Sequence, residues 1–329
     1  MSKTILIRCD ADEKSGFGHF SRCLNLARGI FELSQENKII FIGNFNALAT
    51  QLLSEFGFGS LNASEDREEQ LNRAKEGDYF ILDSYFIDQD YIDLFCDQGF
   101  KFIKIDDFHD MDLEKVDLVV NFRLNIDEKA YRSKRLCLGT DYFPVRKELR
   151  DLRMRNLSRF SDEMRNILVF IGGVDQDRAG EAVVRVLDDF FKGLQITLIT
   201  NQVNQMEYES QHNEIKTITM SYDIDKYFNE ANLIITGGGL TKYECAYCCV
   251  PNAAISQNDG QAIDTTILAK EGLTYDLGMA KDIEKDKEGF TNRIKNLCSP
   301  KVRREIYEKT KEKFKTESTR NLVLAVLET

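Results

Sequence analysis

The chain has 329 residues, of which 42% are hydrophobic and 30% charged, and its formal net charge is −11. This length allows two domains of ordinary size in a globular protein, and the acidic balance argues against a nucleic-acid partner, which would require a basic patch. No apolar run approaches the ~20 residues of a membrane-spanning helix, and residues 1–3 lead directly into a strand rather than a signal peptide, so we expect no membrane insertion and a cytoplasmic location.

The first stretch of the chain is typical of the opening of a doubly wound α/β domain. An apolar run at residues 4–9 predicts a buried strand, and an amphipathic helix follows from about residue 18. Gly16 and Gly18 lie between them and allow a sharp turn close to a ligand. His19 stands at the start of the helix, beyond the carboxyl end of the strand, where such sheets bind ligands. A histidine there is suited to proton transfer near neutral pH, although it is also a common surface or capping residue.

The same glycines approximate a dinucleotide-binding fingerprint. Gly16, Gly18 and Ser21 fall one residue short of the G-x-G-x-x-G pattern. The loop before Gly16 is long, and the next predicted strand, residues 38–43, does not end in an acidic residue that would bind a ribose. The sequence therefore disfavours NAD or FAD binding.

Strands and helices alternate through residues 1–147, which we predict to form the first Rossmann-like domain. Four acids, Asp10, Asp83, Asp106 and Asp107, follow predicted strands and fall on the edge where His19 lies. The remaining strands are expected at residues 78–83, 101–105 and 116–121, and the remaining helices at 46–56, 65–75 and 88–98.

A charged helix at residues 148–158 is predicted to connect to a second Rossmann-like domain, residues 148–329. Strands are expected at 166–173, 196–200, 215–219, 233–236 and 252–255. Helices are expected at 180–191, 223–230, 240–249 and 261–271, followed by two C-terminal helices. The predicted fold class is thus α/β, with two Rossmann-like domains facing a cleft.

Glycines end two strands of the second half. Gly172 and Gly173 close one, and the run 237–239 closes another before a helix. Backbone N–H groups at such places suit a diphosphate, although tight turns without a ligand use the same residues. Glu244, on the following helix near Thr241, can accept both hydroxyls of a ribose or be an ordinary solvated charge. Gln261 can contact a sugar hydroxyl or cap its own helix.

Eight cysteines are spread along the chain, and most lie singly in apolar stretches. Cys245 and Cys248 form a C-x-x-C pattern with Cys249 beside it. A structural zinc site needs four ligands and no second pair is present, while a redox pair belongs at the front of a thioredoxin-like unit. We therefore predict core packing for this cluster, and neither a metal nor a cofactor.

Several motifs together resemble the bacterial UDP-sugar hydrolases of pseudaminic acid biosynthesis, which cleave UDP-2,4-diacetamido-2,4,6-trideoxy-β-L-altropyranose and are related to a spore-coat polysaccharide protein. They occur in family order over nearly the whole chain: Arg8-x-Asp10, Gly16-Phe17-Gly18-His19 with Arg22, Ile81–Tyr85, Ile105–Asp107, Gly139 to Glu148, Gly172-Gly173-x-Asp175 and residues 261–272. The run of three glycines at 237–239, the cysteine cluster and residues 253–259 depart from the family pattern, which leaves the sugar open.

The resemblance implies a glycosyltransferase-B fold, with His19 as the base that activates water and the UDP in the second domain. The predicted catalytic residues are His19 with Asp10 or Asp83 as orienting acids, and the predicted sugar-binding residues are Gly18, Arg22, Tyr85 and Gln261. The predicted nucleotide-binding residues are Gly173, Met220, Gly237, Gly238, Gly239, Thr241 and Glu244.

The leading functional hypothesis is a nucleotide-sugar hydrolase acting on a UDP-amino-sugar for a surface glycan, by attack of water at C1 with inversion. A glycosyltransferase of the same fold would replace the water by a sugar or lipid hydroxyl. A non-catalytic nucleotide-sugar-binding protein would leave His19 without a purpose. The sequence fixes neither the oligomeric state nor the sugar stereochemistry.

Overall fold

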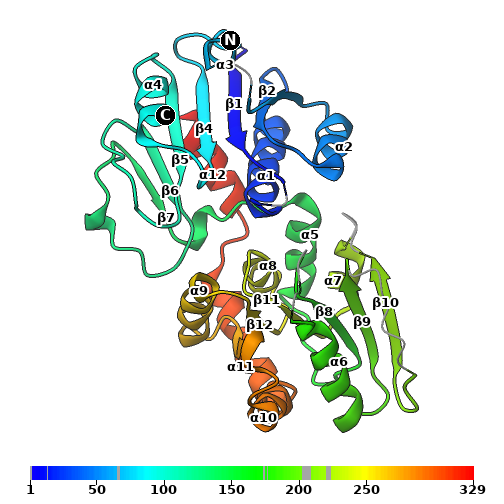
Figure 1. The fold of residues 1–329 in the computed structure, drawn as a ribbon. Coiled ribbons are helices and arrows are strands. Elements are labelled where there is room, and N and C mark those ends of the chain that lie inside the picture. The colour runs from blue at the N-terminus through cyan, green and yellow to red at the C-terminus, as the bar shows by residue number, and fades with distance from the viewer. Residues whose placement is uncertain are drawn as a thin grey trace. The chain divides into compact units, whose positions relative to one another are not determined.

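The computed structural model describes residues 2–12, 14–64, 67–172, 175, 177–201, 209–219 and 224–329. The chain divides into two compact units, one made of residues 1–146 and 317–329 and the other of residues 147–316. Each unit is built on one parallel sheet (Figure 1). The two predicted α/β halves are therefore present.

The first unit contains a seven-stranded sheet in the order β3-β2-β1-β4-β5-β6-β7. All its strand pairs are parallel. The strands are β1 (Thr4–Cys9), β2 (Lys38–Gly43), β3 (Gly59–Asn62), β4 (Tyr79–Asp83), β5 (Lys101–Ile105), β6 (Leu118–Asn121) and β7 (Leu136–Leu138). The helices are α1 (Gly18–Leu33), α2 (Ala47–Glu55), α3 (Arg67–Leu71), α4 (Gln89–Cys96), the short η1 (Glu128–Ala130) and η2 (Thr140–Tyr142), and α12 (Ser318–Leu327).

The centre of this sheet is buried on both faces, as parallel sheets are. Strands β1 and β4 lie side by side, with Cys9 opposite Asp83, and every residue of β4 is buried. The apolar runs that predict these strands in the sequence are continuous rather than alternating for this reason.

Helix α12 completes the first unit by packing along α1 (Figure 1). A Cβ added at Gly29 of α1 would lie 3.0 Å from the side chains of Thr319 and Val323, so the two helices approach closely there. The hydroxyl of Thr319 also bonds both backbone groups of Val145. The prediction that residues 148–329 form the second half is therefore wrong for the last segment, because the apolar face of α12 is buried against α1.

The second unit contains a six-stranded parallel sheet in the order β10-β9-β8-β11-β12-β13. Its strands are β8 (Asn166–Phe170), β9 (Gln195–Thr200), β10 (Glu214–Thr219), β11 (Leu233–Gly237), β12 (Asn252–Ser256) and β13 (Tyr275–Met279). Its helices are α5 (Lys147–Asn156), α6 (Ala179–Phe190), α7 (Asp225–Glu230), α8 (Thr241–Tyr247), α9 (Asp259–Lys270), the short η3 (Ala280–Asp282), α10 (Lys287–Leu297) and α11 (Pro300–Lys313).

The structure adds three strands that the sequence does not predict, namely β3, β7 and β13. Strand β3 is a short, largely exposed edge strand, β7 has three residues, and β13 contains Gly278 at a positive φ. The prediction of two C-terminal helices is wrong, since α10, α11 and α12 follow β13. The three missed strands are too short, too exposed or too irregular to produce a clear hydrophobic period.

Candidate active site

In each sheet the strand order reverses at one point, and several of the predicted site residues follow the strands that flank this reversal. In the first unit the reversal lies between β1 and β4, and in the second between β8 and β11. In open α/β sheets, ligands bind beyond the carboxyl ends of the strands at this switch point. His19 follows β1 and Asp83 ends β4, while Gly172 follows β8 and Gly237 ends β11.

His19 is buried in the first turn of α1 and is oriented by Asp83. The Nδ1 atom of His19 lies 2.7 Å from Oδ1 of Asp83. An ionised carboxylate only accepts hydrogen bonds, and Asp83 is closer to Nδ1 than the competing donor, Nη2 of Arg22, which lies 3.2 Å away. We therefore assign the hydrogen to Nδ1, which donates it to Asp83. The remaining nitrogen, Nε2, is then the basic atom of the neutral ring. A general base needs such an arrangement, in which a neighbouring group, here Asp83, fixes the tautomer and the orientation of the ring.

Arg22 holds Asp83 in its ionised form. The guanidinium is buried and donates to both oxygens of Asp83 and, at 3.1 and 2.9 Å, to both oxygens of Asp107. Burial raises the pKa of Asp83, but Arg22 and His19 outweigh that effect and hold this pKa well below the usual carboxyl range. Burial also opposes the charge of Arg22, and the two carboxylates nevertheless raise its pKa well above the usual value.

Asp107 extends the cluster towards the surface. Its Oδ1 accepts from Nε of Arg123 at 3.1 Å, and the hydroxyl of Tyr85 donates to Oδ2. The Tyr85 ring lies edge-on against His19 with the ring centroids 4.2 Å apart. Burial of the hydroxyl and the charge of Asp107 raise the pKa of Tyr85, so its phenol stays protonated and remains a donor.

Asp10 does not share these contacts, although it also lies at this edge. Its carboxylate is 2.8 Å from Nη1 of Arg8 and accepts from the N–H of Asn44 and the hydroxyl of Ser84. Of the two acids that the sequence offers as partners of His19, the one in hydrogen-bond contact is Asp83. Gly18, at the first position of α1, is exposed.

The glycine segment of the second unit is closely packed on one side. A Cβ at Gly237 would lie 2.0 Å from the carbonyl oxygen of Ile171, so only glycine fits beside that strand end. A Cβ at Gly238 would meet Gln261 at 2.8 Å, whereas one at Gly239 would meet no atom within 4 Å. The backbone is therefore open to a ligand at Gly239.

The residues after this segment belong to α8 and α9. Thr241 and Glu244 are partly buried on α8. Gln261 is partly buried in the first turn of α9, and its Oε1 accepts from the N–H of Gln257 at 2.9 Å. That contact gives Gln261 a structural role. Its predicted contact with a sugar remains a prediction.

The carboxylate of Asp175 occupies the start of α6. Its two oxygens accept from the N–H groups of Ala179 and Gly180 at 2.8 Å. A ligand phosphate at this helix start would have to displace Asp175, so this carboxylate caps the helix and occupies the place of an anion. Gly172 adopts φ of 123°, a conformation that favours glycine. Gly173 and Met220, which the sequence predicts to bind nucleotide, lie outside the described residues.

The cysteine cluster is buried, as predicted. Cys245 and Cys248 are fully inaccessible and Cys249 nearly so, and none of the three forms a disulfide. Burial raises the pKa of Cys245 and of Cys249, which suppresses thiolate chemistry. Within the described ranges, no group of three or more His, Cys, Asp or Glu side chains is arranged to hold a metal ion.

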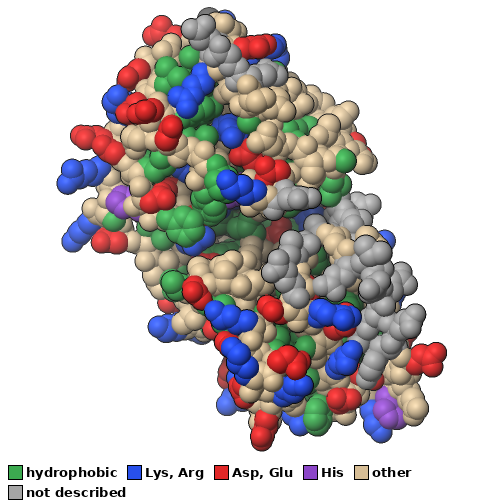
Figure 2. All heavy atoms as spheres, in the orientation of Figure 1, with side chains coloured by type: hydrophobic (Ala, Val, Ile, Leu, Met, Phe, Trp, Pro, Cys, Tyr) green, Lys and Arg blue, Asp and Glu red, His purple; other side chains and the backbone are tan. Residues whose placement is uncertain are grey.

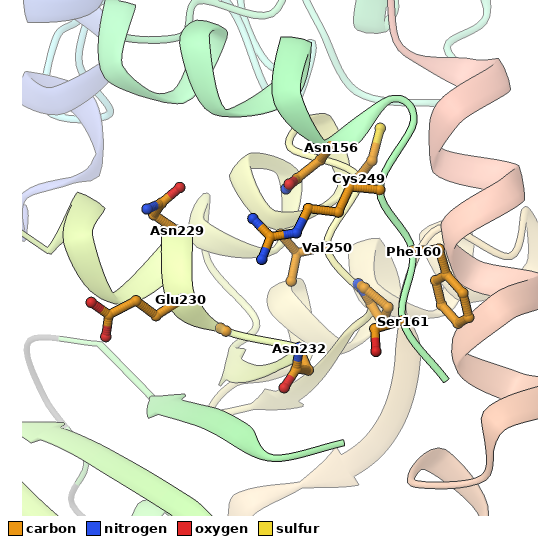
Figure 3. A pocket seen from close by; sticks show the side chains of 11 residues that line it. Asn156, Phe160, Ser161, Asn229, Glu230, Asn232, Cys249 and Val250 are labelled. Atoms are coloured by element: carbon orange, nitrogen blue, oxygen red, sulfur yellow. The ribbon is translucent and has the colours of Figure 1, made fainter. Parts of the chain in front are cut away.

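A small pocket of the second unit lies at the opposite edge of its sheet (Figure 3). Its lining includes Asn232 and Pro251, which precede β11 and β12, so it faces the amino ends of the strands. Its volume of about 50 Å³ is far below the ~300 Å³ of a small ligand site. This pocket is therefore not the predicted nucleotide site.

The surface charge and the length of the helices can be compared with those of proteins that bind nucleic acids or cross membranes. On the face shown in Figure 2, basic and acidic side chains are interspersed, without a continuous basic patch among the described residues. Across the described parts of the chain, no helix combines the length and apolar character needed to cross a membrane.

Known structures share this fold. MurG of Acinetobacter baumannii matches with a TM-score of 0.70 over 100% of both chains at 12% identity. The spinosyn rhamnosyltransferase SpnG matches with a TM-score of 0.66 over 99% and 100% of the two chains at 10% identity. MnaA of S. aureus, solved with UDP, matches with a TM-score of 0.62 over 98% and 95% at 12% identity. The chain therefore has a glycosyltransferase-B type fold.

Sequence comparison gives one distant relative and assigns no family. No family model matches the chain. An uncharacterized protein of Methanocaldococcus jannaschii is 25% identical over 280 residues, which are 78% of this chain and 56% of that protein. The chain thus spans little more than half the length of that relative.

Proposed function

We propose that this chain is an enzyme acting on a UDP-sugar, and specifically a hydrolase that releases UDP from a UDP-amino-sugar. The observation that carries the proposal is the hydrogen bond between Nδ1 of His19 and Asp83, which leaves Nε2 as a base at the switch point of the first sheet. The motifs that resemble the pseudaminic acid hydrolases favour UDP-2,4-diacetamido-2,4,6-trideoxy-β-L-altropyranose or a close relative as the substrate.

The nucleotide is assigned to the second unit. Gly237, Gly238 and Gly239 end β11 beside the switch point, and the backbone is accessible at Gly239. The carboxylate of Glu244, on α8, is proposed to accept the ribose hydroxyls. The structure of MnaA, which shares the fold, was solved with UDP.

In the proposed reaction, Nε2 of His19 takes a proton from a water molecule. The water oxygen forms a bond to C1 of the sugar from the face opposite the diphosphate. The bond between C1 and the diphosphate oxygen breaks, the electron pair leaves with UDP, and the configuration at C1 inverts. General-base assistance of this kind contributes about 10²–10⁴-fold to a rate.

Asp83 and Arg22 are proposed to support this step without touching the sugar. Asp83 fixes the hydrogen of His19 on Nδ1 and stabilises the imidazolium that forms. The sequence predicts Arg22 to bind the sugar, but its buried guanidinium donates to Asp83 and Asp107 and lies 3.2 Å from Nδ1 of His19. We propose instead that Arg22 keeps Asp83 ionised and in place. Tyr85 stands beside the His19 ring with a protonated phenol and is proposed to contact the sugar.

A glycosyltransferase is the second candidate, and the likeness to the rhamnosyltransferase SpnG favours it. The chemistry at His19 would be the same, with a sugar or lipid hydroxyl replacing water. UDP released in buffer without any acceptor supports the hydrolase, whereas release that requires an acceptor supports the transferase.

The bond that breaks is tested by running the reaction in ¹⁸O-water with a panel of UDP-amino-sugars. Attack at C1 places the label in the free sugar and leaves the UDP unlabelled, as read by mass spectrometry at early times. Label in the UDP after one turnover would mean attack on phosphorus and would reject this mechanism. Early reading matters because the free sugar slowly exchanges its anomeric oxygen with solvent.

A further inference from the structure

Lys242, in the first turn of α8, has a completely buried side chain. Burying an ammonium group is costly unless a counter-charge and hydrogen bonds compensate. Its Nζ lies 2.7 Å from Oδ2 of Asp264 on α9, and the other oxygen of Asp264 accepts from the hydroxyl of Tyr243 at 2.7 Å. The charges of Lys242 and Asp264 neutralise each other, so the pair adds little net charge at the carboxyl ends of the strands of the second sheet.

The ammonium makes another contact, with the glycine segment. Nζ of Lys242 donates to the carbonyl oxygen of Gly238. The N–H of Gly238 donates to the carbonyl of Ile255 on β12 at 2.9 Å. Both backbone polar groups of Gly238 are therefore fixed, one by the neighbouring strand and the other by Lys242.

This contact also fixes the next amide. The peptide between Gly238 and Gly239 is planar, and in a trans peptide the C=O and N–H groups point in opposite directions; no cis bond occurs in the described chain. Because the Gly238 carbonyl points to buried Lys242, the N–H of Gly239 points away from it. A Cβ at Gly239 would meet no atom within 4 Å, so the backbone there borders open space.

We propose that Lys242 is a positioning residue for diphosphate recognition: by holding the Gly238 carbonyl inward, it presents the Gly239 N–H to the diphosphate of the nucleotide. The inference rests on the proposed function, which assigns UDP to this unit, and names the backbone group that recognises the phosphates. Lys242 itself does not touch the ligand, because its side chain is buried and its Nζ is directed to Gly238 and Asp264.

Three variants separate the bond from Lys242 to Gly238 from the other contacts of this cluster. Lys242→Met removes the bond to Gly238 but leaves the charge of Asp264 buried without its cation. The double variant Lys242→Met with Asp264→Asn removes both charges and keeps a hydrogen-bonding partner for Tyr243. Tyr243→Phe is the matched control, since it removes one buried hydrogen bond of the same cluster and leaves the bond from Lys242 to Gly238.

The experiment compares binding of UDP with binding of uridine, which lacks the phosphates, by titration calorimetry on the full chain. We expect the double variant to bind UDP about 10-fold or more weakly, the loss that corresponds to one hydrogen bond to a charged group. Uridine affinity should be unchanged, and Tyr243→Phe should bind both ligands like the wild type. A purely structural role would weaken both ligands together.

A measurement on the wild type keeps the inference testable if the variants do not fold. In protein labelled with ¹⁵N-glycine, the Gly239 amide, assigned through Gly239→Ala, should shift strongly on adding UDP and not on adding uridine. Wild-type protein that fails to bind UDP would reject the proposed function itself. UDP binding without a Gly239 shift, or with equal loss of UDP and uridine affinity in the double variant, would reject only the role of Lys242.

Discussion

Nδ1 of His19 and Oδ1 of Asp83 lie 2.7 Å apart although the residues are 64 positions apart in the chain. The pairing of β1 with β4 brings them together, because Cys9 is opposite Asp83 in that ladder and His19 follows the loop after β1. The contact occupies one ring nitrogen of His19 with the carboxylate and leaves the other for the proposed proton transfer.

Replacing His19 by glutamine should reduce turnover by about 10² or more, because the base that activates water is lost. UDP affinity should be nearly unchanged, since the nucleotide is assigned to the other unit. Steady-state kinetics and calorimetry with UDP check the two parts separately. Full activity of the variant would exclude His19 as the base.

Asp83→Asn should lower turnover by about 10²–10⁴, because an amide can donate to Nδ1 and so stabilise the wrong tautomer of His19. Asp10→Asn should have a smaller effect, since Asp10 contacts Arg8 and Ser84 instead of His19. The ratio of kcat values for the two variants measures the difference. A larger loss for Asp10→Asn would contradict the orienting role of Asp83.

Glu244→Ala should weaken UDP binding by about 10-fold or more, because each charge-assisted bond to a ribose hydroxyl is worth about 1.5–3 kcal/mol. Glu312→Ala, an exposed change on α11 of the same unit, serves as the control. Calorimetry with UDP and 2′-deoxy-UDP shows whether the loss depends on the hydroxyls. Equal affinity of Glu244→Ala and wild type would make Glu244 a helix-surface charge only.

Gly237→Ala should destabilise the second unit by about 3 kcal/mol or prevent its folding, because the new Cβ would lie 2.0 Å from the carbonyl oxygen of Ile171. Gly239→Ala should fold like the wild type, since its Cβ would meet no atom within 4 Å. Thermal unfolding followed by circular dichroism ranks the two variants. Similar melting temperatures would contradict the close packing at Gly237.

Acid should destabilise the first unit through its buried carboxylates. Burial raises the pKa of Asp107, but Arg22 and Arg123 outweigh it and hold this pKa well below the usual carboxyl range. A carboxylate whose pKa is lowered in the folded state stabilises that state. The stabilisation is fully present at pH values above the ordinary carboxyl pKa of about 3.9, and it is lost as the pH falls below that value. Urea unfolding at a series of pH values should therefore show a steeper acid loss for wild type than for Asp107→Asn, and equal slopes would contradict this.

The sequence predicts the central strands and the edge that carries the site, because buried parallel strands are long apolar runs and the chain turns after each one. It cannot choose between Asp10 and Asp83 as the partner of His19, since both end strands at the same edge and only the register of β1 against β4 decides. Lys242 looks like a helix-surface charge in the sequence, because its burial depends on Asp264 in another helix. Strands such as β7 are too short for any pattern.

Because α12 belongs to the first unit, that unit can be completed only after the second unit has been synthesised. Helix α12 buries Leu322, Val323 and Val326 in the unit that begins with β1, and Tyr79 on β4 bonds the carbonyl of Leu327. The ribosome makes these residues only after all of residues 147–316. The second unit can therefore fold while the surface of α1 that α12 covers is still exposed.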